Sequence, residues 1–302
     1  PSTGLMDLED LRRRLQRSTP SPRVIIPVDF AGQPSHLPEL GKLAADFGAK
    51  VIEDAAHSLG AHYHVGEQRI AAGACLHSEL AILSFHPIKH ITTGEGGAVL
   101  SNEPALAERI RRLRSHGIHK DPSAFELSTE SPFFGPWYHE QDQLGFNYRI
   151  TDFQCALGLT QLERLPAFVM KRRELARRYD QALAGTPELA QALMPLRTVS
   201  GNEHAYHLYV VRVRQRAQES LESLALRRRA LYEHLRQAQI FAQVNYIPVP
   251  WQPYYRKRGI QAEDYPGARE FYASCLSLPI FPGMSEEDVD RVLEALRTWT
   301  KA

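Results

Sequence analysis

Two short apolar runs on either side of an amphipathic segment most constrain what this chain can fold into. Residues 24–28 form the first run, which ends before Asp29, and Lys50–Asp54 forms the second. Between them, apolar residues recur at helical spacing over residues 37–47. A strand, a helix and a second strand in this order indicate two parallel strands joined by a crossover. The pattern predicts an α/β fold with a mostly parallel sheet.

Further elements follow along the chain. Residues 79–85 and 97–101 predict two more strands. The glycine-rich segment between them lacks the Gly-Lys-Ser/Thr sequence of a phosphate-binding loop, and it precedes a strand rather than a helix. We therefore expect a tight hairpin. Asn102 and Thr151 are expected to cap two helices, and Pro166 is expected to break or restart the second.

The pattern changes after residue 185. Residues 207–213 and 241–247 predict strands, and residues 221–236 and 286–299 predict helices. Such a mixture is typical of an α+β unit. We therefore expect a large domain over residues 1–185 and a smaller α+β domain over residues 186–302. The aromatic segment 122–145 has no clear period, and loops of this length are usually functional or disordered.

Composition argues against several classes of protein. Lys and Arg number 36 and Asp and Glu number 35, for a net charge of +1, which removes the usual argument for a nucleic-acid binder. No run approaches the ~18 apolar residues that a membrane span needs. Cys75, Cys155 and Cys275 form no Cys-x-x-Cys pair, which fits a reducing compartment. The residues after Pro1 do not resemble a signal peptide, so we expect a cytoplasmic protein.

The 13 histidines raise the question of a metal site. The close pairs are His62 with His64 and His116 with His119, and neither has the helical spacing or the neighbouring cysteines of a zinc site. We expect no metal. The arginine runs 111–114 and 227–229 indicate solvated helix faces rather than binding patches.

Three polar residues stand where chemistry can be placed. Asp54 and Ser84 end predicted strands, and Lys89 follows Ser84 by five residues. In open α/β sheets, ligands bind outside the carboxyl ends of the strands. There a carboxylate can hold a cationic ring nitrogen, a hydroxyl can hold a phosphate, and a desolvated lysine can form a Schiff base. Each also has a plain alternative: a turn-capping aspartate, a strand-end serine and an exposed lysine.

Taken in order, these residues resemble the sugar-nucleotide aminotransferases of the aspartate-aminotransferase fold, which use pyridoxal 5'-phosphate (PLP). The resemblance covers nearly the whole chain and is strongest over residues 24–61, 84–100 and 135–162. The last two stretches, with residues 243–248 and 252–256, look most like the UDP-4-amino-4,6-dideoxy-N-acetyl-beta-L-altrosamine transaminases of pseudaminic acid synthesis. The resemblance implies a fold type I PLP-dependent transferase.

The resemblance also assigns roles to matching positions. Lys89 would be the catalytic residue that carries the cofactor, Asp54 would pair with its pyridinium nitrogen, and Ser84 would hold its phosphate. His57, where many relatives carry Gln, would lie by the ring and its 3-hydroxyl. Asn147 would reach the phosphate bound by the partner subunit, which implies a homodimer with shared active sites.

The substrate side is implied in the same way. Val244, Asn245 and Tyr246 would face the sugar nucleotide, although relatives often carry His at the position of Asn245. The implied reaction transfers an amino group from L-glutamate to C4 of a UDP-linked 4-keto-6-deoxy amino sugar. Family members have a substantial segment before the position of Pro1, so we expect this chain to lack part of the large domain and of the site.

Two other functions stay open. The first is a lyase or dehydratase on the same fold; relatives that deoxygenate sugars replace the catalytic lysine by His, and this chain retains Lys89. The second is a truncated, non-catalytic fragment that folds or dimerises without binding the cofactor productively. An absorbance spectrum tests the second, because lysine-bound PLP absorbs visible light and borohydride bleaches it, whereas absence of that band even with added cofactor favours the fragment.

Overall fold

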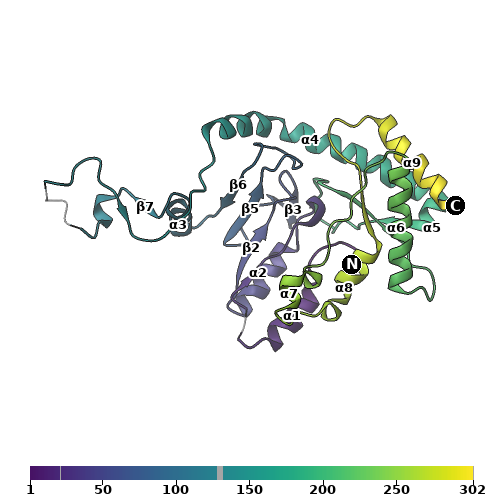
Figure 1. The fold of residues 1–302 in the computed structure, drawn as a ribbon, viewed down its shortest axis with the longest axis horizontal. Helices are drawn as coiled ribbons and strands as arrows, with labels where there is room; N and C mark the ends of the chain where they lie inside the picture. The colour runs from purple at the N-terminus through teal and green to yellow at the C-terminus, as the bar shows by residue number, and fades with distance from the viewer. Residues whose placement is uncertain (21, 128–131, 302) are drawn as a thin grey trace.

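The computed structural model describes residues 1–20, 22–127 and 132–301 (Figure 1). The central sheet has four strands, in the order β1 (Val24–Ile25), β2 (Lys50–Asp54), β5 (Leu80–Ser84) and β6 (Gly97–Leu100). The first three run parallel, and β6 runs antiparallel to β5. The expected α/β fold with a mostly parallel sheet is confirmed.

The strand expected over residues 24–28 is shorter than predicted. β1 ends at Ile25, and beyond it only Val28 makes a single bridge to Asp54. Pro27 explains the interruption, since it has no N–H to donate to a ladder. Its carbonyl oxygen still accepts a hydrogen bond from the Asp54 N–H at 2.9 Å, so the chain stays beside β2 up to the site.

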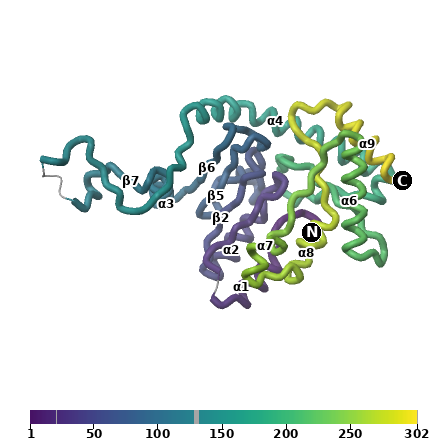
Figure 2. Tube along the Cα trace, in the orientation of Figure 1, coloured from purple at the N-terminus to yellow at the C-terminus, as the bar shows by residue number. Residues whose placement is uncertain are grey.

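Helices α1 (Leu8–Arg17) and α2 (Leu37–Asp46) cover part of this sheet. The helical spacing of Leu40 and Leu43 turns them toward Val51 of β2, and all three are buried in one cluster. Burial of one such side chain stabilises the fold by about 1.5–3 kcal/mol. Figure 2 shows α1 beside α7 (Pro253–Arg256) and α8 (Pro266–Ser274), so the first helix meets a segment about 250 residues later in the sequence, as the bond from Arg14 to the Asp264 carbonyl also shows.

A second sheet was not anticipated from the sequence. β3 (His62–Val65) and β4 (Gln68–Ala71) form an antiparallel hairpin, and β10 (Asn202–Glu203) joins β3. Tyr63 and Ile70 are the buried residues of this hairpin, so its apolar alternation is weak. The visible signal is Gly66, which takes a φ of 59° in the turn.

Two predictions about helix ends and breaks are wrong. Asn102 does not cap α3 (Pro104–Arg114): its side chain donates to the Ala74 carbonyl at 2.9 Å, and Glu103 is the N-cap residue. Pro166 does not break α4 (Asp152–Gly185), which is continuous. Leu165 and Val169, on either side of the proline, pack against Ala61, and this packing keeps the helix in one piece. The Thr151 cap of α4 is confirmed.

The C-terminal part forms a three-stranded antiparallel sheet in the order β12 (Cys275–Leu278), β11 (Tyr209–Val213), β9 (Leu193–Pro195). Helices α6 (Leu221–Gln237) and α9 (Glu286–Lys301) share its core. The end of α4, with Leu175 and Tyr179, belongs to this core too. The domain boundary at residue 185 stays a prediction.

The strand expected over residues 241–247 is absent. One bridge joins Gln243 to Ser277. Beyond it, a side-chain bond replaces the ladder, because the Ser277 hydroxyl donates to the Asn245 Oδ1 at 2.7 Å.

The remaining elements are short. They are the 3-10 turns η1 (Phe30–Gly32), η2 (Pro122–Ala124), η3 (Val249–Trp251) and η4 (Ala262–Asp264), the helix α5 (Pro187–Ala192) and the strands β7 (Ile118–His119) and β8 (Glu140–Gln141). Residues 128–131 of the aromatic segment that we expected to be irregular lie outside the described residues. No helix in the described part of the chain has the length and apolar character to cross a membrane.

Candidate functional site

The carboxyl ends of β2 and β5 place the first candidate residues. Asp54 is the last residue of β2 and Ser84 is the last of β5. The two strands are parallel neighbours, so both residues lie on one edge of the sheet. Lys89 lies in the turn that follows β5, where its N–H donates to the His86 carbonyl at 2.9 Å. The structure thus brings these sequence-predicted residues to the same edge.

Lys89 has the electrostatic surroundings of a reactive amine. Its side chain is half-buried, and this desolvation lowers the pKa of Lys89. The negative charge of Asp54 opposes the shift and raises the same pKa. A lowered pKa increases the fraction of neutral amine near pH 7, and the neutral amine is the nucleophile and the base.

His57 lies in the turn after β2 and is buried. Desolvation, followed by the positive charge of Lys89, lowers the pKa of His57 to about 3, so its ring is neutral. The His57 Nδ1 has no hydrogen-bond partner among the described residues. An unsatisfied buried polar atom costs about 1–3 kcal/mol, so this nitrogen marks a position where a ligand or a water can bind.

From the C-terminal part, Tyr246 approaches the same place. Its ring centroid lies 6.3 Å from that of His57. Burial, and then the charge of Asp54, raise the pKa of Tyr246. Val244 and Asn245 turn the other way: Val244 packs against the core, and Asn245 is buried and bonded to Ser277.

Ser84 and Asn147 differ in how close they come to these groups. Ser84 is half-buried, and its Oγ accepts from the His86 N–H at 3.5 Å. Asn147 is exposed, pairs with Ser115 through a β-bridge, and shares no described bond with Lys89 or Asp54. The chain alone therefore does not bring Asn147 to the others.

Sequence analysis assigned a role to His57 but missed the other buried histidines that cluster with it. The cluster comprises His57, His90, His204 and His207. The rings of His57 and His207 lie 4.3 Å apart, and those of His90 and His207 lie 5.6 Å apart. Burial lowers the pKa of each of them. The sequence contains His204 and His207 close together, but it does not indicate that this segment packs against the turn after β2.

The cavity nearest to this chemistry has a volume of about 460 Å³. Lys89, His207, Arg172, Gln243 and Ser277 are among its lining residues, so it lies between the end of β5 and the C-terminal part. Within the described residues, no group of three or more His, Cys, Asp or Glu side chains could hold a metal ion.

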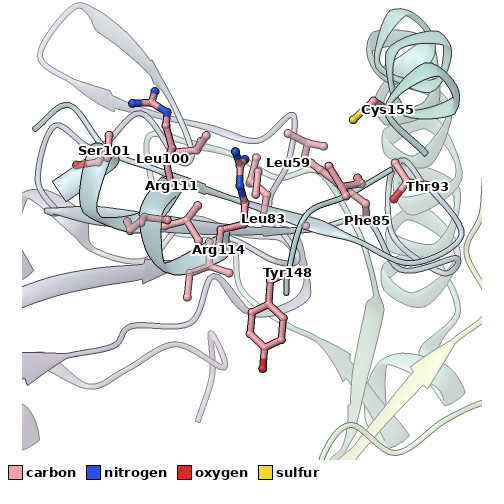
Figure 3. A pocket seen from close by; sticks show the side chains of 18 of the residues that line it. Leu59, Leu83, Phe85, Thr93, Leu100, Ser101, Arg111, Arg114, Tyr148 and Cys155 are labelled. Carbon is pink, nitrogen blue, oxygen red and sulfur yellow. The ribbon is translucent and has the colours of Figure 1, made fainter. Parts of the chain in front are cut away.

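A larger cavity, of about 920 Å³, lies elsewhere and is mainly apolar. Leu83, Val99, Ile110, Tyr148 and Leu159 are among its lining residues, from the sheet, α3 and α4. Figure 3 shows Tyr148, Leu83 and Arg114 around it. Neither Lys89 nor Asp54 lines this cavity, so its size does not make it the reaction site.

The fold and the edge of its sheet define the class of the protein. A lysine of lowered pKa beside a carboxylate, on a mostly parallel sheet followed by an α+β part, is the arrangement of a fold type I PLP-dependent enzyme. Residues 1–297 match the family model of the DegT/DnrJ/EryC1/StrS aminotransferases. The chain belongs to this family and is a PLP-dependent sugar aminotransferase, which confirms the family, fold, enzyme class and cofactor expected from the sequence.

Known proteins agree with this assignment. The chain is 34% identical over 284 residues to the spore coat polysaccharide biosynthesis protein SpsC of Bacillus subtilis, covering 94% of this chain and 68% of that protein. The putative sugar aminotransferase Spr1654 of Streptococcus pneumoniae, in its PMP form, superposes with a TM-score of 0.82 at 27% identity, covering 99% of this chain and 74% of that one.

The Helicobacter pylori aminotransferase PseC, which is involved in the biosynthesis of pseudoaminic acid, also has a TM-score of 0.82, at 26% identity. That likeness covers 100% of this chain and 72% of PseC. The chain thus spans between 68% and 74% of the length of these three relatives.

Proposed function

We propose that this sugar aminotransferase moves an amino group from L-glutamate to C4 of a UDP-linked 4-keto-6-deoxy amino sugar, a reaction of pseudaminic acid synthesis. The likeness to PseC over the whole chain supports the choice of substrate. The observation that carries the chemistry is the half-buried Lys89, whose pKa is lowered by burial beside the charge of Asp54. We also propose a cytoplasmic location, which the three free cysteines fit.

The candidate residues fit PLP. The unpartnered His57 Nδ1 offers a hydrogen-bonding position beside the ring and its 3-hydroxyl. Asp54, at the strand end, would hold the pyridinium nitrogen, and Ser84, at the neighbouring strand end, would hold the phosphate. When bound, PLP supplies the electron sink for amino-group transfer. The protein contributes orientation, charge and a proton carrier.

Lys89 is the proposed proton carrier. Its neutral amine would take the proton from Cα of the amine donor as a base and later release it as an acid, and it would act in the reverse order for the sugar. The lowered pKa of Lys89 suits this work, because a base is effective when its pKa lies near the working pH. Tyr246 approaches from the C-terminal part, on the side where the sugar nucleotide would enter.

We propose that the working form is a homodimer. Asn147 is exposed, and its neighbours Phe146 and Tyr148 line the apolar cavity of about 920 Å³. On the adjoining start of α4, the side chain of Phe153 is 91% exposed. Large exposed apolar surfaces mark interaction sites. A second copy seated on this surface would bring Asn147 to its partner's cofactor phosphate.

A spectroscopic experiment tests the proposal. The purified protein is loaded with PLP, and the visible band is followed first on addition of L-glutamate and then on addition of a UDP-linked 4-keto sugar. We expect glutamate to remove the band and the keto sugar to restore it, with Lys89→Ala as the inactive control. A band that glutamate leaves unchanged, or that returns only with a keto acid and not with a keto sugar, contradicts the proposed reaction.

A further inference from the structure

Two carboxylic acids lie fully buried behind the candidate site, and none of the roles above uses them. Asp29 follows β1 and is 0% exposed, and Glu53 lies in β2 and is 1% exposed. Burial raises the pKa of both groups. The negative charge of Asp29 also raises the pKa of Glu53, so Glu53 is the one of the two that keeps its proton.

Asp29 is bonded to both ends of the turn that follows β2. Its backbone N–H donates to the carbonyl oxygen of Asp54 at 3.0 Å. Its Oδ2 accepts from the hydroxyl of Ser58 at 2.7 Å, and its Oδ1 accepts from the N–H of Ser35 at 2.7 Å. The Ser58 side chain is 0% exposed, so no water competes for this bond.

The other described bonds of the turn are local. The Ser58 N–H donates to the Ala55 carbonyl at 3.0 Å, and the Ala61 N–H donates to the Ser58 carbonyl at 2.8 Å. The Ala56 N–H donates to the Asp54 Oδ1 at 3.2 Å, and the Ser58 hydroxyl also lies 3.3 Å from the Ala55 carbonyl oxygen. These bonds lie within the turn or at its ends and do not connect it to the segment after β1. Among the described side-chain bonds of the turn, the bond from the Ser58 hydroxyl to Asp29 makes that connection. His57 is carried on this turn, and Asp54, the last residue of β2, directly precedes it.

We propose that Asp29 is the positioning residue of the cofactor site: its buried carboxylate, acting through Ser58, fixes the turn that presents Asp54 and His57. The inference rests on the proposed roles of those two residues. A constellation that binds a cofactor must be held to within about 0.5 Å. Loss of the Ser58 hydroxyl leaves an Asp29 oxygen buried without a donor, so the turn loses its link to β1.

Ser58→Ala is the test, and Ser274→Ala is its matched control. Ser274 is also 0% exposed, and its hydroxyl also makes buried bonds: it accepts from the Arg212 Nε and donates to the Glu270 carbonyl, both at 2.9 Å. It lies in the C-terminal part and contacts neither Asp54 nor His57 in the described structure. Both variants remove one buried hydroxyl, but only one removes it from the turn.

Two measurements are made on each variant. Hydrogen exchange with mass spectrometry on the protein without added cofactor follows the amides of residues 54–61. Titration with PLP then gives its Kd, and the visible circular dichroism of the bound cofactor reports the orientation of its ring. In Ser58→Ala we expect amide exchange in residues 54–61 to rise about tenfold or more, the Kd for PLP to rise about tenfold, and the dichroism to change, since 1.4 kcal/mol corresponds to a factor of ten. Ser274→Ala should lower the melting temperature without any of these effects.

Unchanged exchange over residues 54–61 in Ser58→Ala overturns the inference, and so does faster exchange with unchanged PLP affinity and dichroism. If wild-type protein binds no PLP, the proposed function fails, while the exchange measurement still decides whether Asp29 fixes the turn. Should Ser58→Ala not fold, Asp29→Asn replaces one acceptor oxygen by a donor and is measured in the same way. Glu53→Gln, which is neutral like the protonated acid and can still accept from the Gly73 N–H, should behave like wild type; a loss as large as that of Asp29→Asn contradicts the assignment of the proton to Glu53.

Discussion

The ring of His57 lies 4.3 Å from the ring of His207, although the first belongs to the turn after β2 and the second precedes β11. Gly32 makes this approach possible. A Cβ at Gly32 would lie 2.9 Å from the carbonyl oxygen of His57 and 2.8 Å from the backbone nitrogen of His207. Segments far apart in the sequence therefore meet at Gly32 with no room for one methyl group, and this contact joins the sheet edge to the C-terminal part.

Gly32→Ala should separate these segments. Gly32 has a φ of +100°, so a side chain is strained there before any collision is counted. Overpacking adds about 1–3 kcal/mol, and the unfolding free energy should fall by at least that amount. Gly259→Ala is the control, since Gly259 has a φ of +83° with no atom within 4 Å of the new Cβ. If urea unfolding shows an equal loss of unfolding free energy in the two variants, the close approach at Gly32 does not contribute to the loss.

The buried histidines make stability depend on pH. Burial lowers the pKa of His57, His90 and His204 to about 3 and that of His207 further, against about 6.5 in an unfolded chain. Below pH ~6.5 the unfolded chain thus binds protons that the folded chain does not. Their contribution is fully present above that pH and is lost as the pH falls from about 6.5 toward 3.

His90→Gln tests this dependence with little change of shape. A glutamine amide can still donate to the Ala205 carbonyl, which His90 Nε2 contacts at 3.1 Å. Between pH 4 and 6, the slope of unfolding free energy against pH should decrease by up to about 1.4 kcal/mol per unit. Above pH 7 the two slopes should coincide. If unfolding free energy falls as steeply with decreasing pH in His90→Gln as in wild type, His90 is charged in the folded protein.

Asp54→Asn should change the protonation of Lys89. The charge of Asp54 raises the pKa of Lys89, so its removal lowers that pKa further. In protein without cofactor, acylation of Lys89 by acetic anhydride, followed by mass spectrometry, should reach its midpoint at lower pH than in wild type. Turnover should fall on the order of 100-fold, because a preorganised charge at the reacting group is lost. A midpoint that does not move means that the two groups do not interact.

Asn147 can be assigned to a subunit by complementation. In the proposed dimer, Lys89 of one chain and Asn147 of the other serve one site. A dimer of Lys89→Ala with Asn147→Ala then has one site that lacks both residues and one that retains both, so refolding the two inactive variants together should restore activity. If both residues serve their own chain, each site of the mixed dimer lacks one of them. Verified heterodimers with no recovered activity would therefore rule out the shared site.

The elements that place Asp54, Ser84 and Lys89 could be predicted from the sequence. Apolar runs bounded by polar residues located β2 and β5, because strands inside a mostly parallel sheet are rich in apolar residues. The order of those residues indicated the family and its cofactor, which the family match confirms. The residue roles themselves stay predictions.

What the sequence missed depends on tertiary contacts. Pro166 predicts a helix break from the local sequence, but packing on either side of it keeps α4 continuous. Asn102 is of a residue type that often caps helices, but its side chain instead donates to the carbonyl of Ala74 in a distant loop. Only the folded structure shows that His207 lies against His57, because no local sequence pattern distinguishes a histidine that belongs to a site.

The most direct test of the account is to locate the lysine that holds the cofactor. Wild-type protein is incubated with PLP, reduced with borohydride and digested, and the peptides are sequenced by mass spectrometry. The account predicts a pyridoxyl group on Lys89, with loss of the visible band on reduction and no modified peptide in Lys89→Ala. A pyridoxyl group on another lysine, or none at all after saturation with PLP, would contradict it.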